Sequence, residues 1–175
     1  MKIKRVVVGP LDTNCYILEK ENQVLVIDPG DEVEKIRQVI GSAKVLKVLI
    51  THKHFDHIGA LYDIMDLEKI ESLEADTKEE AEYKLGPFTF EVIKTPGHSK
   101  DSICFYFKKD KVMFVGDFIF KRNIGRCDLP TGSFNEMKKS IEKIKKYPKD
   151  IILYPGHGSS TTLEEECLLN PYFFE

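Results

Sequence analysis

The sequence T-H-K-H-F-D-H at residues 51–57 decides how the rest of the chain is interpreted. It follows the stretch 45–51, which is mostly apolar and rich in β-branched residues, and such a stretch predicts a strand buried on both faces. In an extended segment the side chains at positions i and i+2 point the same way. His52 and His54 are therefore expected to approach one metal ion, and Asp56 and His57 follow closely enough to reach a second ion beside it.

Two downstream motifs hold the remaining histidines, and a third holds an aspartate. His98 stands in T-P-G-H-S (95–99), His157 in P-G-H-G (155–158), and Asp117 follows Val115-Gly116. A glycine before each of these residues allows the backbone to turn sharply at the end of a strand. Five imidazoles with two carboxylates suit zinc, iron or manganese at a two-metal centre and argue against calcium. Because no cysteine joins the set, an open catalytic centre is favoured over a closed structural zinc site.

The composition predicts one soluble domain over residues 1–175, with 42% apolar and 31% charged residues. A net charge of −3 with mixed signs gives no reason to expect nucleic acid or a membrane as a partner. The chain has no apolar stretch of membrane-spanning length, and its N-terminus has no signal-peptide core. The four cysteines are widely spaced, which is typical of reduced thiols, and a cytoplasmic location is expected.

The patterning predicts strands and a helix, twice over. Helices are expected at 31–40, 58–66, 134–147 and 162–169, the third opened by the capping-box spacing of Ser133 and Glu136. Residues 121–132 are expected to form a loop, and 76–85 form a charged segment with no clear pattern. Strands are expected at 2–8, 14–19, 23–27, 45–51, 88–94, 102–108, 111–115 and 151–154. This order indicates two sheets with helices packed outside them.

The metal motifs resemble those of the metallo-β-lactamase superfamily. T-H-K-H-F-D-H matches its H-x-H-x-D-H signature, and His98, Asp117 and His157 match its remaining ligand motifs in the same order. The resemblance implies an α/β fold, an αββα four-layer sandwich of two mixed β-sheets with helices on the outer faces. It also implies how the ligands divide. His52, His54 and His98 would hold the first metal, and Asp56, His57 and His157 the second. Asp117 would bridge the two metals, and Asp28 would support the ligands from behind.

Further motifs resemble particular branches of that superfamily. The segments Gly116-Asp117-Phe-Ile-Phe and Gly125-Arg126-Cys-Asp128-Leu-Pro are similar to those of glyoxalase II and of persulfide dioxygenases. The C-terminal residues Gly156-His157-Gly158, Glu166 and Asn170-Pro171-Tyr172 resemble the short, single-domain glyoxalase-II-like hydrolases. Because true β-lactamases lack the bridging aspartate, Asp117 argues against antibiotic hydrolysis.

The resemblance leaves the substrate open. Arg126 matches the family's basic position and is predicted to bind an anionic substrate, whereas Asp128 stands where an aromatic residue would help to bind glutathione. The chain ends without the C-terminal helical domain that binds glutathione in full-length glyoxalase II, and the stretch between His57 and His98 is short for the family. A glutathione thioester is therefore one candidate among several.

The predicted function is that of a dinuclear-metal hydrolase. It would cleave a small-molecule thioester of the hydroxyacylglutathione type, or an ester, by attack of a metal-bridging hydroxide that Asp56 orients. Two divalent ions are expected, with zinc favoured and iron or manganese as alternatives. One alternative function is a mononuclear iron persulfide dioxygenase that uses His52 or His54 with His98 and Asp117. Others are lactonase or phosphodiesterase activity on the same centre, or a metal-holding domain that acts through partners.

Overall fold

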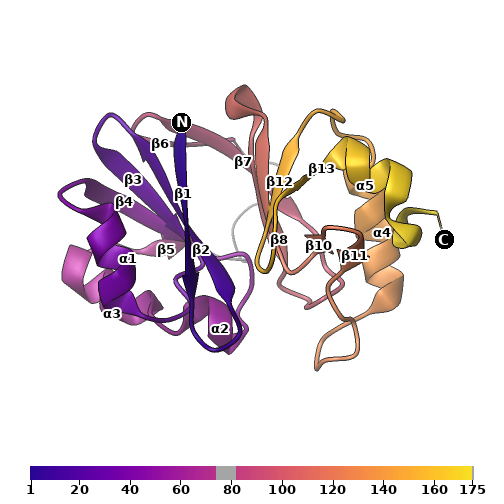
Figure 1. The fold of residues 1–175 in the computed structure, drawn as a ribbon, viewed down its shortest axis with the longest axis horizontal. Helices are drawn as coiled ribbons and strands as arrows, with labels where there is room; N and C mark the ends of the chain where they lie inside the picture. Colours follow the sequence, from indigo (N-terminus) through magenta and orange to yellow (C-terminus); the bar gives the residue numbers. More distant parts are fainter. Residues whose placement is uncertain (74–81, 175) are drawn as a thin grey trace.

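Two β-sheets, each covered on its outer face by helices, form the computed structural model, which describes residues 1–73 and 82–174 (Figure 1). The first sheet has the order β1-β2-β3-β4-β5, from Lys2–Val8, Thr13–Lys20, Gln23–Ile27, Lys44–Leu49 and Ser72–Leu73. Strands β1 to β3 pair antiparallel, whereas β3, β4 and β5 run parallel. This sheet is therefore mixed.

The second sheet is also mixed, because its β12 and β9 are parallel and its other pairs antiparallel. Its order is β13-β12-β9-β8-β7-β6, from Thr161–Thr162, Ile152–Pro155, Val112–Gly116, Ile103–Phe107, Phe88–Lys94 and Glu82–Leu85. A small hairpin of β10 (Ile119–Phe120) and β11 (Asn123–Ile124) follows β9. The helices are α1 (Val33–Ile40), α2 (Phe55–Ile58), α3 (Leu61–Glu68), α4 (Phe134–Ile144) and α5 (Leu163–Leu169), with 3₁₀ turns at Lys108–Asp110 and Pro171–Phe173.

Three apolar layers hold the sheets and helices together, because successive strand side chains point to opposite faces. In β2, Ile17 packs in the cluster with the residues of α1 and α3, and its neighbour Leu18 packs between the sheets. In β9, Met113 packs in the cluster with α4, and Phe114 packs between the sheets. In Figure 1, α1 and α3 lie outside the first sheet, and α4 and α5 outside the second. The predicted αββα four-layer sandwich is confirmed.

Most predicted elements are present, and the differences have local causes. The helix expected at 58–66 is present as α3 from Leu61 to Glu68, but its start differs: Ile58 ends α2, and Gly59 lies between the two helices, where a Cβ would lie 2.2 Å from the Gly30 carbonyl oxygen. Helix α1 begins at Val33 rather than at 31, because Glu32 has the left-handed φ of 50°. Helix α4 ends at Ile144 rather than at 147. The predicted loop 121–132 contains β11.

The charged segment 76–85 lies outside the described residues up to 81, and its remainder forms β6. Among the residues that the model describes, no helix is both long enough and apolar enough to cross a membrane.

Candidate metal centre

All seven predicted ligands lie in segments that follow buried strands, and these segments meet at one edge of the two sheets. The turn after β4 brings His52 and His54, and α2 brings Asp56 and His57. His98, Asp117 and His157 follow β7, β9 and β12. The backbone that carries them is tightly fitted: a Cβ on Gly156 would lie 2.2 Å from Asp117 Oδ1. The glycine before His157 is therefore required by space, whereas Gly116 before Asp117 has a left-handed φ of 51°.

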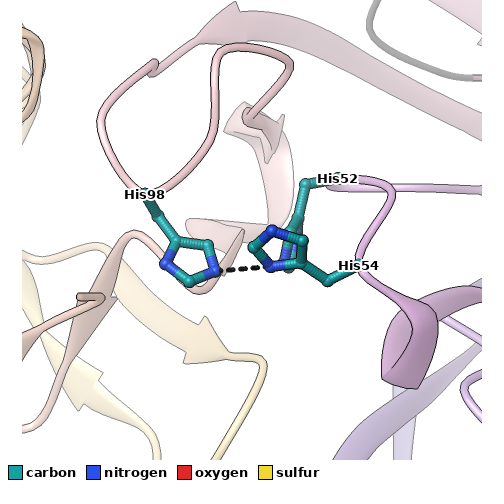
Figure 2. A group of neighbouring side chains, drawn as sticks. All are labelled: His52, His54 and His98. Atoms are coloured by element: carbon teal, nitrogen blue, oxygen red, sulfur yellow. Dashed lines mark hydrogen bonds between the residues drawn. The ribbon is translucent and has the colours of Figure 1, made fainter. Parts of the chain in front are cut away.

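The ligand atoms form three overlapping groups, within each of which they lie no more than 4.8 Å apart. One group is His52, His54 and His98, whose rings face one another in Figure 2. Another is Asp56, His57 and His157. The third joins the two halves and consists of His52, His57 and Asp117.

Asp117 lies between the two predicted sites. Its Oδ1 is 3.3 Å from His57 Nε2, and its Oδ2 is 3.4 Å from His157 Nε2 and 3.6 Å from His98 Nε2. One carboxylate therefore faces ring nitrogens of both predicted sites, as a bridging ligand requires.

Backbone carbonyls fix the orientation of two histidine rings. His98 Nδ1 donates to the Arg126 carbonyl at 2.7 Å, and His157 Nδ1 donates to the Leu11 carbonyl at 3.0 Å. Because a carbonyl oxygen can only accept, both rings carry their proton on Nδ1. Their Nε2 atoms are left facing the centre of the cluster, where a metal-binding histidine presents its lone pair once its proton is released.

Asp28 fixes two more rings from behind. Its Oδ2 accepts from His57 Nδ1 at 2.9 Å and from the Thr51 hydroxyl at 2.6 Å, and its Oδ1 accepts from the Thr51 backbone N–H at 2.8 Å. Since the Thr51 hydroxyl donates to Asp28, its oxygen accepts from His52 Nδ1 at 3.1 Å. Asp28 therefore lies behind the candidate ligands, and it orients His57 directly and His52 through Thr51.

His54 presents its other ring nitrogen to the cluster. Its Nδ1 is 2.9 Å from His98 Nε2, the contact drawn as a dashed line in Figure 2. In the protein without metal one of these nitrogens must carry a proton, whereas a cation between them would accept both lone pairs.

A divalent cation fits this donor set. Four buried side-chain polar atoms in the described part of the chain lack a hydrogen-bond partner, and three belong to the cluster: His52 Nε2, His57 Nε2 and Asp117 Oδ1. Buried polar atoms are almost always satisfied, so their convergence on one point indicates a missing partner of positive charge.

The surroundings of the candidate ligands shift their pKa values in different directions. Burial raises the pKa of Asp56 and Asp117, but hydrogen bonds from His157 together with the neighbouring His57 outweigh it, and both pKa values lie below the usual range. Burial and the charge of His57 hold the pKa of His52 well below its usual range. Burial lowers the pKa of His57, but the carboxylates of Asp28 and Asp117 together outweigh it and raise the pKa to about 10. Hydrogen bonds to Asp117 and Asp56 raise that of His157 to about 10.

A cavity of about 1260 Å³ opens onto the cluster. Its apolar lining includes Leu11, Phe55, Phe120, Ile124, Leu129 and Pro130, and its cationic lining includes Lys53, Lys100 and Arg126. The Arg126 guanidinium makes two hydrogen bonds of 2.8 Å to the Asp128 carboxylate, and both side chains are exposed. The predicted anion-binding residue is therefore at the cavity, but it is paired within its own loop.

Three polar residues of β2 that the sequence analysis did not assign hold the site together. Thr13 Oγ1 donates to Asp56 Oδ2 at 2.9 Å. The Asn14 amide donates to the carbonyls of Pro155 and Gly158 at 2.9 Å, and the Tyr16 hydroxyl donates to the Pro155 carbonyl at 2.7 Å. The available signal was the presence of polar residues within a strand whose side chains are buried.

Comparison with known proteins places these features in a family. The family model described as Metallo-beta-lactamase superfamily matches residues 8–74 and 66–157. The chain is 34% identical over 205 positions to the probable metallo-hydrolase YqgX of Bacillus subtilis, covering 98% of this chain and 97% of that protein. It is 32% identical over 207 positions to the hydroxyacylglutathione hydrolase GloC of Haemophilus influenzae, covering 98% of each. Since this chain has 175 residues, both alignments contain residues of the relatives that it lacks.

Solved structures agree with the fold. The crystal structure of BLEG-1 B3 metallo-beta-lactamase superposes with a TM-score of 0.94 and 31% identity, covering 99% of this chain and 100% of that one. The structure of TTHA1623 in a di-iron-bound form has a TM-score of 0.88 and 29% identity, covering 97% and 99%. One neighbour is thus named a β-lactamase and another contains two iron ions, so β-lactams and iron belong among the substrates and metals to be tested.

Proposed function

This chain belongs to the metallo-β-lactamase superfamily, and we propose that it is a hydrolase that cleaves a small-molecule thioester or ester at a centre of two divalent metal ions. The observation that carries this proposal is the convergence of five imidazoles and two carboxylates on two adjacent positions. A metal-dependent hydrolase is what the family and its named relatives support. The thioester is the more specific part of the proposal.

The ligands would divide between the two ions. His52, His54 and His98 would hold one, and Asp56, His57 and His157 the other, with Asp117 facing both. When bound, the ions would lower the pKa of a water that they share and polarise the carbonyl of the substrate. Zinc suits the imidazole-rich set, and the di-iron neighbour supports iron as the alternative.

Asp56 would orient the attacking water. Its carboxylate lies at the cavity, its Oδ2 accepts from Thr13 Oγ1, and its lowered pKa keeps it charged at neutral pH. A charged carboxylate held in this way accepts a hydrogen bond from the water and aims its lone pair at the carbonyl carbon. A thiolate leaving group could then depart without a dedicated proton donor, which favours a thioester over an amide.

The cavity favours a substrate with an apolar part and an anionic part. Leu11 and Phe55 line the cavity beside the predicted second site. The Leu11 carbonyl accepts from His157, and Phe55 directly precedes Asp56. Lys100 and Arg126 line the part of the cavity near His98. A thioester with an acidic thiol carrier matches this division, and the relative named hydroxyacylglutathione hydrolase supports that class.

Metal quantitation and a substrate panel test the proposal together. The purified chain should contain up to two divalent ions and should hydrolyse a thioester or ester faster than a lactone, a phosphodiester or a β-lactam. Asp56→Asn should abolish most of this activity, whereas Asp63→Asn, an exposed carboxylate on α3, should leave it unchanged. One iron per chain, with oxygen uptake on a persulfide and no hydrolysis, would reject the proposal in favour of a dioxygenase.

A further inference from the structure

A buried carboxylate, Glu166 of α5, lies outside the metal centre and is surrounded by hydrogen-bond donors. Its Oε1 accepts from the Thr161 hydroxyl at 2.6 Å and from the Arg122 guanidinium at 3.2 Å. Its Oε2 accepts from Asn170 Nδ2 at 2.8 Å and from the backbone N–H of Arg122 at 2.9 Å. The side chain is 0% exposed. Because a buried charge is costly unless its hydrogen bonds are made, Glu166 is a fixed point of the structure.

These donors tie α5 to the turn of the β10–β11 hairpin. Arg122 is the turn residue, with a left-handed φ of 64°, and its guanidinium also donates to Glu165 at 2.6 Å. Next to it, the carbonyl of Asn123 accepts from Asn170 Nδ2 at 3.0 Å.

The hairpin leads directly to the metal centre. Gly125 follows β11, and a Cβ there would lie 1.8 Å from the Asp117 carbonyl oxygen and 3.1 Å from His98 Nδ1. The next carbonyl, that of Arg126, accepts the hydrogen bond from His98 Nδ1. Residues 123–126 also line the cavity. Any displacement of the hairpin therefore reaches both a ligand ring and the wall of the cavity.

We propose that Glu166 is a positioning residue for the metal centre. It holds the β10–β11 hairpin so that the Arg126 carbonyl keeps the His98 ring, with its Nε2, aimed at the predicted first site. This proposal rests on the proposed function only in requiring that the cluster bind metal. It also gives a role to Glu166 and Asn170, which the resemblance to single-domain hydrolases singled out and the reaction does not use.

The test compares Glu166→Gln with Glu165→Gln. Both replace a carboxylate by an amide and both remove a contact to Arg122, but Glu165 is 34% exposed and does not contact Asn170. Loss of an immediate hydrogen-bond partner of a metal-binding histidine weakens metal binding about 10- to 100-fold. Glu166 acts one link further away, so Glu166→Gln should weaken Zn²⁺ binding about 3- to 10-fold in a chelator competition. It should also shift the visible spectrum of the Co²⁺-loaded chain. Glu165→Gln should change neither.

A stability control separates positioning from general weakening of the fold. Ile36→Val removes one methyl group under the first sheet, far from the hairpin in the sequence. Equal metal affinities of Glu166→Gln and Ile36→Val, after comparable losses in Tm, would overturn the proposal. If Glu166→Gln does not fold, Arg122→Gln, a partly exposed position in the hairpin turn, must show the same weakened binding. If the chain binds two ions and the variants do not differ in metal affinity, only the positioning role is rejected. If the chain binds no metal, the proposed function is rejected as well.

Discussion

Replacement of Asp28 by asparagine should leave a proton on His57 Nε2, the atom that would otherwise bind the metal. Asp28 is buried and accepts three hydrogen bonds, from the Thr51 backbone, the Thr51 hydroxyl and His57 Nδ1. In Asp28→Asn the amide oxygen keeps the Thr51 backbone N–H, and the amide nitrogen, a donor, faces His57. His57 can pair with it only as the other tautomer, which carries its proton on Nε2. That atom is the one that faces Asp56 and Asp117.

The expected loss of metal affinity is large because Asp28 contacts His57 directly. His57 Nδ1 lies 2.9 Å from the carboxylate, so Asp28 is its immediate partner. Changes at such partners typically weaken metal affinity about 10- to 100-fold, which corresponds to about 1.4 to 2.8 kcal/mol. The site of Asp56, His57 and His157 should lose most. The His52, His54 and His98 site should lose less, because Asp28 reaches His52 only through Thr51.

Zn²⁺ titration by calorimetry, with and without a competing chelator, would resolve the two sites. Asp31→Asn is the matched control, since Asp31 is exposed in the same loop and its carboxylate accepts a hydrogen bond from the Glu32 backbone N–H. NMR of the imidazole nitrogens in metal-free Asp28→Asn would show whether His57 has lost the proton on Nδ1, which the metal-free parent chain holds together with one on Nε2. Two sites of unchanged affinity in Asp28→Asn, or a His57 ring that keeps its proton on Nδ1, would refute the reasoning.

Three further predictions concern the shared carboxylate, proton release and the cavity. Asp117→Ala should abolish activity and lower the metal content at both sites, because its carboxylate faces both; full activity with two ions bound would exclude a bridging role. His57 and His157, with pKa values raised to about 10, are protonated at neutral pH without metal. Metal binding should therefore release up to two protons and strengthen as the pH rises from 7 towards 10, which calorimetry in buffers of different ionisation enthalpy measures; binding independent of pH would contradict this. Arg126→Ala should raise the KM of an anionic substrate more than it lowers kcat. Asp128→Asn should lower that KM a few-fold by freeing the guanidinium, and a neutral ester should show neither change.

The clustering of the candidate ligands was predictable because these residues are chemically unusual and close to strand ends. Histidine and aspartate after an apolar strand stand out in any sequence, and a period of two assigns His52 and His54 to one face. The four layers were predictable because strands and helices alternate in two blocks. Both inferences use only short-range pattern, which the sequence contains in full.

The supporting contacts were not predictable, because they join residues that are distant along the chain. The acceptors of His98 and His157 are the backbone carbonyls of Arg126 and Leu11, which have no side-chain signature. The pairing of Arg126 with Asp128 depends on the conformation of an exposed loop. The broken helix near Gly59 depends on the approach of a second loop, at Gly30. Tertiary packing determines each of these features.

The position of His157 sets how late in synthesis the cluster can be completed. His157 is held by the Leu11 carbonyl, and Asn14 and Tyr16 hold the Pro155 carbonyl, so the loop that carries it forms only against a strand made about 140 residues earlier. Chains are made from the N-terminus, and early segments begin to fold first. A nascent chain already contains His52, His54 and His98 long before His157 emerges. The Arg126 carbonyl that orients His98 also comes late, and so does Glu166, which we propose to hold its hairpin, so neither predicted site can be completed until nearly the whole chain has been made.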